Sequence, residues 1–388
     1  MSAPTVTSTI RYIGVDDKTI DLFESQYPVP NGVSYNSYAI LDQKLAILDT
    51  VDPRGTEQWL KNLEQTLAGR QPDYLVVSHM EPDHAGNIQR LCEMYPNLQV
   101  VGNAKTFTMI GQFFTLDLPD SRKVLVGEGD TLSLGAHTLQ FFMAPMVHWP
   151  EVMVTYEQSE KVLFSADGFG KFGTLDTQED WACEARRYYF NIVGKYGGPV
   201  QQLLKKAAAL DIEIICPLHG PVLRENLGYY IGLYDTWSRY QPEDEGVLLA
   251  HASIHGHTAK AAEKMAEILR QKGAEVVLCD LNRTDVSEAV EDAFRYSKML
   301  LAAASYDAGL FPSMEAFLHH LKAKTYQNRA VALMENGSWA PSAGKCMKAL
   351  LGEMKNIDLC EQMVSIRSAM KETDLPAMEA LADELLQK

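Results

Sequence analysis

Six consecutive residues of the chain contain four potential metal ligands. In the order His79-Met80-Glu81-Pro82-Asp83-His84 they bring two imidazoles and two carboxylates together. Alternate residues of an extended chain point to one side and neighbours to opposite sides, so such a segment can face two cations at once. Imidazole and carboxylate both bind divalent transition metals. We therefore predict a two-metal site, although Ser, Asp and Pro also favour an ordinary capped turn after a strand.

Other ligand types follow apolar runs in the same way as this motif follows Tyr74–Ser78. Leu139–Val147 ends at His148, Lys161–Ala166 ends at Asp167, and Ile212–Leu218 ends at His219. A single His after a strand is usually a hydrogen-bonded loop residue. Because four strand ends share this placement, we expect these side chains to lie on one rigid rim, as a functional site requires.

The motifs taken together resemble a known family. The first motif, His148-Trp149-Pro150, Ser165-Ala166-Asp167-Gly168-Phe169-Gly170 and Pro217-Leu218-His219-Gly220-Pro221 resemble, in order and in flanking residues, the metallo-β-lactamase-like domain of flavodiiron proteins. The resemblance implies an αββα sandwich that binds two non-haem iron ions. It implies that His79, Glu81 and His148 bind one iron, that Asp83, His84 and His219 bind the other, and that Asp167 bridges them.

Glu81 distinguishes this set from the zinc hydrolases of the same superfamily, which usually carry His at that place. Four imidazoles and three carboxylates suit non-haem iron, although the affinity order alone does not exclude zinc. Two ferrous ions bring four positive charges, and Glu81, Asp83 and Asp167 offset three of them. The alternative interpretation is a zinc-dependent hydrolase of the lactamase fold with a flavodoxin-like appendage.

Composition limits the class of protein. The 388 residues, 46% hydrophobic and 22% charged, are enough for two or three soluble domains. The net charge of −16 argues against a nucleic-acid partner. No apolar run approaches the ~20 residues of a membrane helix, and Met1–Thr5 lacks the basic start of an export signal, so we expect no membrane association and a cytoplasmic location. The six cysteines contain no Cys-x-x-Cys pair, which excludes a rubredoxin-like module within this chain.

Strand and helix patterns predict the elements around the first motif. Half-alternating runs such as Ser34–Leu41 and Leu45–Asp49 predict antiparallel sheet. Helices are predicted over Gly55–Leu67 and Gly86–Tyr95, on either side of the motif. Gln241–Gly246 brings proline, glycine and three acids, and we place the domain boundary there, between a diiron domain at residues 1–243 and a second domain at 246–388.

The second half alternates strand, loop and helix. Strands near Val247, Val276, Leu300, Val331 and Val364 predict a flavodoxin-like, doubly wound parallel sheet of five strands. Its switch-point loops are Ser253-Ile254-His255-Gly256-His257-Thr258, Ser305-Tyr306-Asp307-Ala308-Gly309-Leu310 and Asn336-Gly337-Ser338-Trp339.

The first of these loops precedes a helix, where backbone N–H groups and the helix dipole bind an anion. It lacks the Gly-x-Gly-x-x-Gly spacing of dinucleotide folds, and its hydroxyls suit the terminal phosphate of FMN, although Ser and Thr are also routine helix caps. Tyr306 or Trp339 could stack on the flavin. All three loops resemble those of flavodiiron proteins, and His255 and His257 are predicted to be phosphate-loop residues rather than metal ligands.

The two predicted sites fit a single reaction. Reduced FMN and two ferrous ions hold four electrons, enough to convert O2 to two waters, and two electrons convert two NO to N2O. The resemblance therefore implies an O2 and/or NO reductase that receives electrons from a separate donor such as rubredoxin. It also implies a head-to-tail homodimer, or a dimer of dimers, with one subunit's flavin beside the other's irons. A flavodoxin-like electron carrier with a purely structural first domain would retain seven ligand positions by accident.

Overall fold

The structure, a computed structural model, describes residues 5–388. Met1–Pro4, on which the expected lack of an export signal partly rests, lie outside the described residues. The chain divides into one unit of Met1–Tyr189 and Gly198–Asp235 and a second of Phe190–Gly197 and Thr236–Lys388. The units differ from the predicted ranges 1–243 and 246–388 in two places, because Phe190–Gly197 joins the second unit and the long part of that unit begins at Thr236.

The first unit is built on two β-sheets. The six-stranded sheet has the order β1 (Ile10–Tyr12), β6 (Tyr38–Leu41), β7 (Leu45–Leu48), β8 (Tyr74–Val76), β9 (Gln99–Gly102) and β10 (Lys123–Leu125). The five-stranded sheet has the order β11 (Thr131–Ser133), β12 (Thr138–Met143), β13 (Met153–Glu157), β14 (Val162–Phe164) and β15 (Ile214–Cys216). Two small ribbons, β2 (Val15–Asp17) with β5 (Val33–Tyr35) and β3 (Leu22–Phe23) with β4 (Tyr27–Pro28), complete the strands described in this unit.

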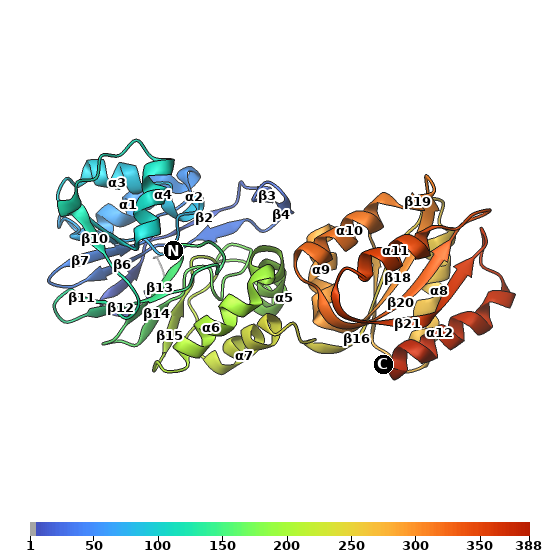
Figure 1. Cartoon of the computed structure of the whole chain (residues 1–388). Helices are drawn as coiled ribbons and strands as arrows, with labels where there is room; N and C mark the ends of the chain where they lie inside the picture. Colours follow the sequence, from blue (N-terminus) through green and yellow to red (C-terminus); the bar gives the residue numbers. More distant parts are fainter. Residues whose placement is uncertain (1–4) are drawn as a thin grey trace. The chain divides into compact units, whose positions relative to one another are not determined.

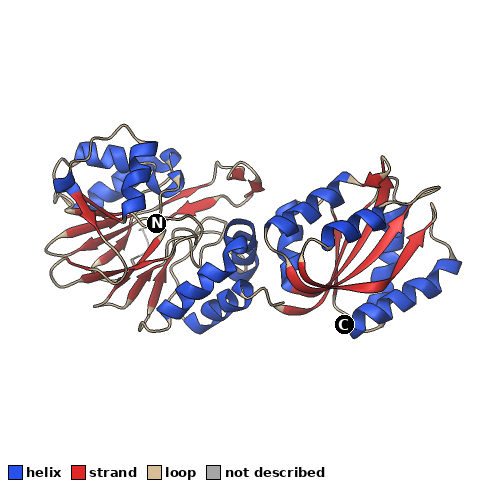
Figure 2. Ribbon diagram, in the orientation of Figure 1, coloured by secondary structure: helices blue, strands red, loops and turns tan. Residues whose placement is uncertain are grey.

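Helices cover the outer faces of both sheets (Figures 1 and 2). The helices on the side of the first sheet are α1 (Thr56–Leu67), α3 (Ile88–Met94) and α4 (Ala104–Phe113), with the single turn α2 (Pro82–Ala85) beside them. Those on the side of the second sheet are α5 (Trp181–Tyr188), α6 (Gly197–Ala207) and α7 (Leu227–Ser238). This is the predicted αββα sandwich.

The hydrophobic core of this unit lies between the two sheets. Ile10, Tyr38 and Ile40 of the first sheet belong to the same buried cluster as Phe141 and Phe164 of the second. The rings of Tyr38 and Phe164 meet edge to face at 5.3 Å. Full burial of such side chains stabilises the fold by about 1.5–3 kcal/mol each. The core therefore holds the strand ends in fixed positions.

Hydrogen bonds join the two sheets at the edge where the predicted ligands lie. Met153 N–H donates to the carbonyl of Ser78 at 3.1 Å, and Asn36 N–H donates to the carbonyl of Leu218 at 2.8 Å. The strands β7, β8 and β9 run parallel, as do β14 and β15. Their carboxyl ends consequently meet at one rim.

The second unit is a parallel five-stranded sheet with helices on both faces (Figure 1). Its order is β17 (Val276–Asp280), β16 (Asp244–Ala252), β18 (Tyr296–Tyr306), β20 (Gln327–Asn336) and β21 (Lys355–Ile366), with the short β19 (Gly309–Leu310) antiparallel to β18. Its helices are α8 (His257–Gln271), α9 (Val286–Arg295), α10 (Pro312–Ala323), α11 (Ala343–Leu351) and α12 (Leu375–Gln387). The predicted flavodoxin-like, doubly wound parallel sheet of five strands is confirmed.

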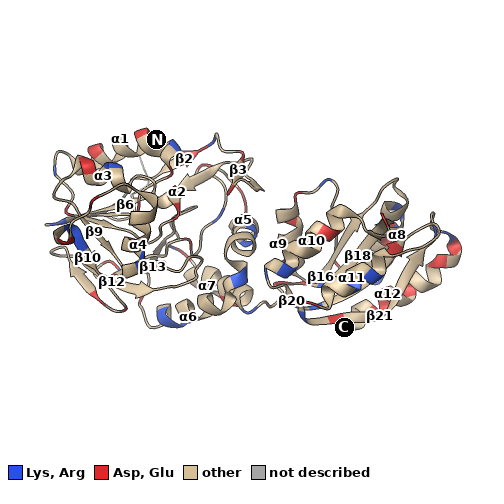
Figure 3. Ribbon diagram, turned by 45° about the horizontal axis from the view of Figure 1, so that its top comes forward, with Lys and Arg blue, Asp and Glu red and all other residues tan. Residues whose placement is uncertain are grey.

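None of the helices in residues 5–388 is both long and apolar enough to cross a membrane. Figure 3 shows Lys and Arg scattered among Asp and Glu over both units. No described element is basic along its whole length in that view.

Candidate metal centre and cofactor pocket

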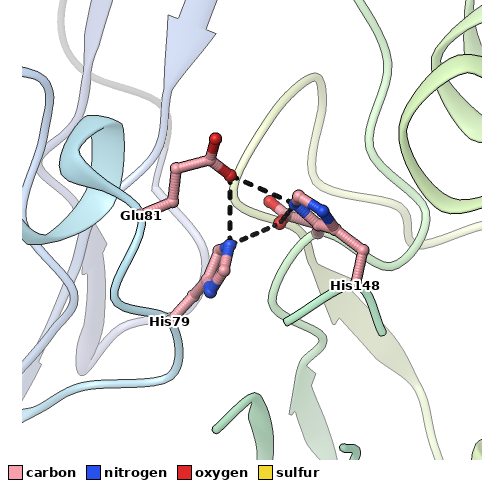
Figure 4. A group of neighbouring side chains, drawn as sticks. His79, Glu81 and His148 are labelled. Carbon is pink, nitrogen blue, oxygen red and sulfur yellow. Dashed lines mark hydrogen bonds and ion pairs between the residues drawn. The ribbon is translucent and has the colours of Figure 1, made fainter. Parts of the chain in front are cut away.

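The fold brings all seven predicted metal ligands into two groups. His79, Glu81, His148 and Asp167 form the first group, and Asp83, His84 and His219 form the second. Within each group the ligand atoms lie within 4.8 Å of one another. Figure 4 shows the imidazoles of His79 and His148 and the carboxylate of Glu81 pointing toward one another, His79 and Glu81 from one segment and His148 from another.

Asp167 lies between the two groups and reaches both. Its Oδ2 is 3.3 Å from Nε2 of His79 and 3.4 Å from Nε2 of His148. Its Oδ1 is 3.3 Å from Nε2 of His84 and 3.8 Å from Nε2 of His219. One carboxylate therefore presents one oxygen to each group, which is the arrangement that a bridging ligand needs.

In each group one atom lies close to two other ligand atoms. Oε2 of Glu81 is 3.2 Å from Nε2 of His79 and 3.1 Å from Nε2 of His148. In the second group, Nε2 of His84 lies 3.0 Å from Nε2 of His219 and 3.3 Å from Oδ2 of Asp83. The side chain of His84 thus points into the group.

The first motif does not continue as an extended strand edge, and that part of the prediction is wrong. Glu81 has extended backbone and stands at the N-cap of α2, with Pro82 at its first position. Proline favours that position because its fixed φ suits a helix. Asp83 and His84 consequently lie in a helical turn, where adjacent side chains can approach one point, whereas His79 and Glu81 converge as alternate residues do.

Glu151 orients His79, and sequence reasoning missed this residue. The Nδ1–H of His79 and the backbone N–H of Met80 both donate to Oε1 of Glu151, each at 2.8 Å. A carboxylate that holds the outer nitrogen of an imidazole fixes the tautomer and turns the other nitrogen to the metal. The sequence feature that could have indicated this residue is a glutamate three residues after His148, just before a strand.

Two backbone contacts hold other parts of the site. Nδ1 of His219 lies 2.8 Å from the carbonyl oxygen of Ser34, which fixes that ring. The buried Asp49 accepts the N–H of Ser78 at 2.7 Å, directly before the motif. Burial raises the pKa of Asp49 to about 6, although hydrogen bonds from Ser78 oppose this change.

The charges of the site stabilise one another in the absence of metal. Burial by itself lowers the pKa of His148, but hydrogen bonds to Asp167 and Glu81 outweigh it and raise this pKa to about 9. Burial also opposes protonation of His79, yet Asp167, Glu151 and Glu81 raise its pKa well above the usual range. Burial would raise the pKa of Asp167, but His79, His148 and His84 hold it well below its ordinary value. Without metal, protonated imidazoles therefore balance the negative charge of the carboxylates, and bound cations would take over this role.

The donor atoms fit metal ions. Both carboxylate oxygens of Asp83 are buried and have no hydrogen-bond partner within the described part of the chain, and those of Asp167 are buried and face the imidazole nitrogens of the other ligands. A buried charged oxygen without a partner is costly, so such atoms in native proteins usually bind an ion. Three carboxylates and four imidazoles suit iron among the divalent metals.

Aromatic side chains surround the two groups. The ring of His219 contacts Phe23 at 5.4 Å, Tyr35 at 5.9 Å and Tyr188 at 5.5 Å. Trp149 lies edge to face with His79 at 5.1 Å. The aromatic shell limits water around the ligands.

The second unit contains a cavity of about 580 Å³ at the carboxyl end of its sheet. This volume is typical of a pocket for a small cofactor. The predicted flavin residues that line it are Ser253, His255, His257, Thr258, Ser305, Tyr306, Asp307, Ala308, Asn336, Gly337, Ser338 and Trp339. The lining residues that were not predicted are Ile254, Ala304, Ala340, Ser342 and Ser368. Ser342 and Ser368 lie beyond the three loops in sequence, so no local motif indicated them.

Three predicted flavin residues do not line this cavity. Leu310 is buried. Gly309 pairs with Tyr306 in the β18–β19 hairpin. Gly256 has a φ of +85° at the N-cap of α8, and its N–H donates to Oγ of Ser253 at 3.1 Å. These residues shape the loops, and the neighbouring side chains form the pocket surface.

Two aromatic side chains stand at the mouth of the cavity with large exposed areas. Trp339 is 89% exposed and Tyr306 is 44% exposed. Both lie on loops that begin at the carboxyl ends of parallel strands, the usual place for a ligand in this fold. Exposed aromatic rings at a pocket offer flat surfaces on which a ring system can stack.

Comparisons with known proteins agree with this architecture. Residues 33–220 match the family model described as ODP family beta lactamase. The nitric oxide reductase of Moorella thermoacetica is 28% identical over 366 residues, which cover 92% of this chain and 91% of that protein. The resemblance to flavodiiron proteins inferred from the motifs is confirmed.

Two solved structures have the same fold over the whole chain. The rubredoxin oxygen:oxidoreductase of Desulfovibrio gigas matches with a TM-score of 0.92 and 24% identity, covering 100% of this chain and 98% of that one. The flavodiiron protein of Giardia intestinalis matches with a TM-score of 0.92 and 24% identity, covering 100% and 97%. Both domains of the predicted fold class are therefore confirmed.

Proposed function

We propose that this chain, whose residues 33–220 match the ODP beta lactamase family and whose whole length has the flavodiiron fold, is an oxidoreductase that reduces O2 to water, NO to N2O, or both. The observation that carries the proposal is Asp167, which presents one buried oxygen to each group of ligands. A hydrolase needs no flavin, whereas the second unit contains a cavity of flavin size.

The residues that would hold two iron ions are those of the two groups. His79, Glu81 and His148 would bind one ion, Asp83, His84 and His219 the other, and Asp167 both. Bound iron would supply electrons and Lewis acidity to a small diatomic substrate. The aromatic shell would exclude water, and Glu151 would keep the ring of His79 directed at its ion.

FMN would occupy the cavity of the second unit. Its phosphate would lie at the N-terminus of α8, where Ser253, Thr258 and free backbone N–H groups gather. Its isoalloxazine ring would stack on Trp339 or Tyr306. The loop residues that line the cavity support this placement.

Electrons would come from a separate protein of rubredoxin type. The Desulfovibrio gigas relative is named for rubredoxin, and this chain has no Cys-x-x-Cys pair of its own. A head-to-tail homodimer, or a dimer of dimers, in the cytoplasm completes the proposal, because the resemblance implies that the flavin of one subunit serves the irons of the other.

Metal and turnover measurements test the proposal. Anaerobically purified protein should contain about two irons and one FMN per chain. Asp167→Ala should abolish O2 and NO consumption and leave the flavin absorbance unchanged, while His319→Ala, at an exposed position on α10, should behave as the wild type. Stoichiometric zinc without iron, together with hydrolase activity, would support the hydrolase interpretation instead.

A mixing experiment tests the dimer. His79→Ala lacks a ligand in the first unit, and a variant that cannot bind FMN lacks the electron source. Each should be inactive alone. If electrons cross between subunits, dimers reassembled from both variants should regain part of the activity. Absence of any recovery in verified mixed dimers would contradict the head-to-tail arrangement.

A further inference from the structure

Another cluster of metal-ligand types lies in the first unit and is separate from the two groups described above. His137, Glu157 and Glu160 offer one imidazole nitrogen and two carboxylate oxygens within 4.8 Å of one another. We propose that these three side chains bind a structural divalent metal ion of the zinc type. The ion would join the β11–β12 turn to the β13–β14 turn, whose Glu160 also accepts hydrogen bonds from Thr7 and Thr9.

The cluster lies at the opposite end of the β13–β14 hairpin from the predicted irons. His148 precedes β13 and Asp167 follows β14, whereas Glu157 ends β13 and Glu160 precedes β14. With a rise of about 3.3 Å per residue, Glu157 is roughly 13 Å along the strand from Met153. A metal in this cluster would therefore be distinct from the iron site.

His137 supplies the observation that points to an ion. Its side chain is only 5% exposed, and its Nδ1 lies 3.0 Å from Oε1 of Glu157. This buried nitrogen has no well-directed hydrogen bond among residues 5–388. The backbone N–H of His137 donates to Oδ2 of Asp42 at 2.7 Å, which holds the residue in place. A buried imidazole nitrogen that faces carboxylates without a hydrogen bond suits a metal ligand.

The two carboxylates are already oriented by surrounding donors. Glu157 accepts the N–H of Ser159 at 2.9 Å on Oε1 and that of Glu160 at 2.6 Å on Oε2. Glu160 accepts the hydroxyl of Thr7 at 2.5 Å on Oε2 and that of Thr9 at 3.0 Å on Oε1. Each carboxylate oxygen has a further lone pair for an ion. Such outer hydrogen bonds are typical of protein metal ligands.

The charge of the cluster also favours a bound cation. The side chain of Glu157 is fully buried, and Glu160 is half-buried. Within residues 5–388 neither carboxylate has an ion pair with Lys or Arg, and the guanidinium of Arg11 instead donates to the carbonyl of Thr7 at 2.6 Å. One imidazole cannot neutralise two carboxylates, and uncompensated buried charge is costly. A divalent ion would balance both.

The number and type of ligands favour zinc. One nitrogen and two oxygens from the protein leave a fourth tetrahedral position for water. The adjacent turn residues Gln158 and Ser159 are exposed, so an ion can reach the cluster from solvent. No proposed flavin or iron ligand takes part, and the role assigned to the ion is structural.

Zinc binding to the iron-loaded holoprotein tests this site. Zinc chloride is added, excess zinc is removed by dialysis, and zinc, iron and FMN are counted per chain. We expect one zinc in the wild type and His319→Ala, and none in His137→Ala or Glu160→Gln. Glu160→Gln retains an oxygen that can accept from the threonine hydroxyls, and unchanged circular dichroism and FMN content show that the variants fold.

Equal zinc content in the wild type and in both folded variants would overturn the proposal. So would a wild type that binds no zinc, which would leave a protonated His137 paired with Glu157 as the explanation of the cluster. A preparation without iron would contradict the proposed function and not the zinc site. The zinc site is judged only by the difference in zinc content between wild type and variants, so failure of one proposal can be told from failure of the other. Zinc should also raise the thermal midpoint of the wild type and leave that of His137→Ala unchanged.

Discussion

At the scale of single residues, the metal centre depends on side chains that hold its ligands. Glu151 accepts hydrogen bonds from both His79 and Met80, and so connects the loop before β13 to the first motif. Its pKa is lowered because hydrogen bonding to His79 outweighs burial, which by itself would raise it. Glu151 therefore acts as an anionic acceptor beside the first ligand group.

Removal of this acceptor should weaken metal binding without unfolding the protein. Glu151→Ala should lower iron affinity about 10–100-fold, because an unheld imidazole loses its orientation and basicity. Glu151→Gln, which keeps one acceptor oxygen, should recover part of the affinity. Iron content after dialysis against a graded chelator measures the effect. Glu57→Ala, at an exposed position on α1, is the control, and equal iron retention in all four proteins would contradict the role.

The pKa shifts predict how pH acts on the metal-free protein. The pKa of His148 is raised from 6.5 to about 9, so this group stabilises the fold fully below about pH 6.5 and loses its contribution as pH rises toward 9. The thermal midpoint of metal-free protein should consequently fall between pH 6.5 and 9. Iron binding displaces these protons, so the iron-loaded protein should show a smaller decrease. Parallel midpoint curves for the two forms would argue against the assignment.

At the scale of elements, short loops after rigid strands present the chemistry. Serines, threonines and aromatic residues at the carboxyl ends of β16, β18 and β20 line one cavity. The parallel order of the sheet places these loops side by side, as in other doubly wound sheets. Because Trp339 is largely exposed, it can be substituted without disturbing the core, and it is therefore suited to test what this cavity binds.

Substitution of this tryptophan should weaken FMN binding. Trp339→Ala should raise the Kd for FMN roughly three- to tenfold, since an aromatic pair contributes about 0.5–1.5 kcal/mol beyond its buried area. Trp339→Phe should retain most of the affinity. Quenching of flavin fluorescence on titration measures Kd. If Trp339→Ala binds FMN with the wild-type Kd, the isoalloxazine ring must stack on Tyr306 instead.

At the scale of the whole molecule, the two compact units are not simply consecutive in the chain. Phe190–Gly197, from the first half, belongs to the second unit. The ring of Phe190 stacks on that of Phe294 at 4.0 Å with an interplanar angle of 10°. Asn191 donates from its side chain to the carbonyl of Ser287 at 3.1 Å. The segment therefore packs against α9 of the second unit.

Loss of the stacked ring should destabilise the second unit. Phe190→Ala should cost about 3–5 kcal/mol, the usual range for a buried phenylalanine. Chemical unfolding followed by flavin release measures this loss. Phe113→Ala, at a position 45% exposed, should cost much less. Equal effects of the two substitutions would contradict the packing described.

The sequence by itself predicted which residues would gather at the two sites. Ligand types in the first motif and after apolar runs, together with the resemblance they carry, predicted the seven metal-site residues, and the strand-loop-helix alternation predicted the flavin loops and a parallel five-stranded sheet. The residues gather as predicted because strand ends and switch-point loops are local features that residue type and periodicity reveal. The metal and flavin assignments themselves stay predictions until binding is measured.

Only the tertiary structure decided which atoms face one another. It alone showed that Asp167 reaches both groups, that Glu151 holds His79, that Phe190 packs in the second unit, and that His137 meets Glu157 and Glu160. In each case the partners lie on different segments, and their approach depends on how the sheets pack, which no local pattern specifies. Residue types therefore predicted the site, and packing between distant segments determined its geometry.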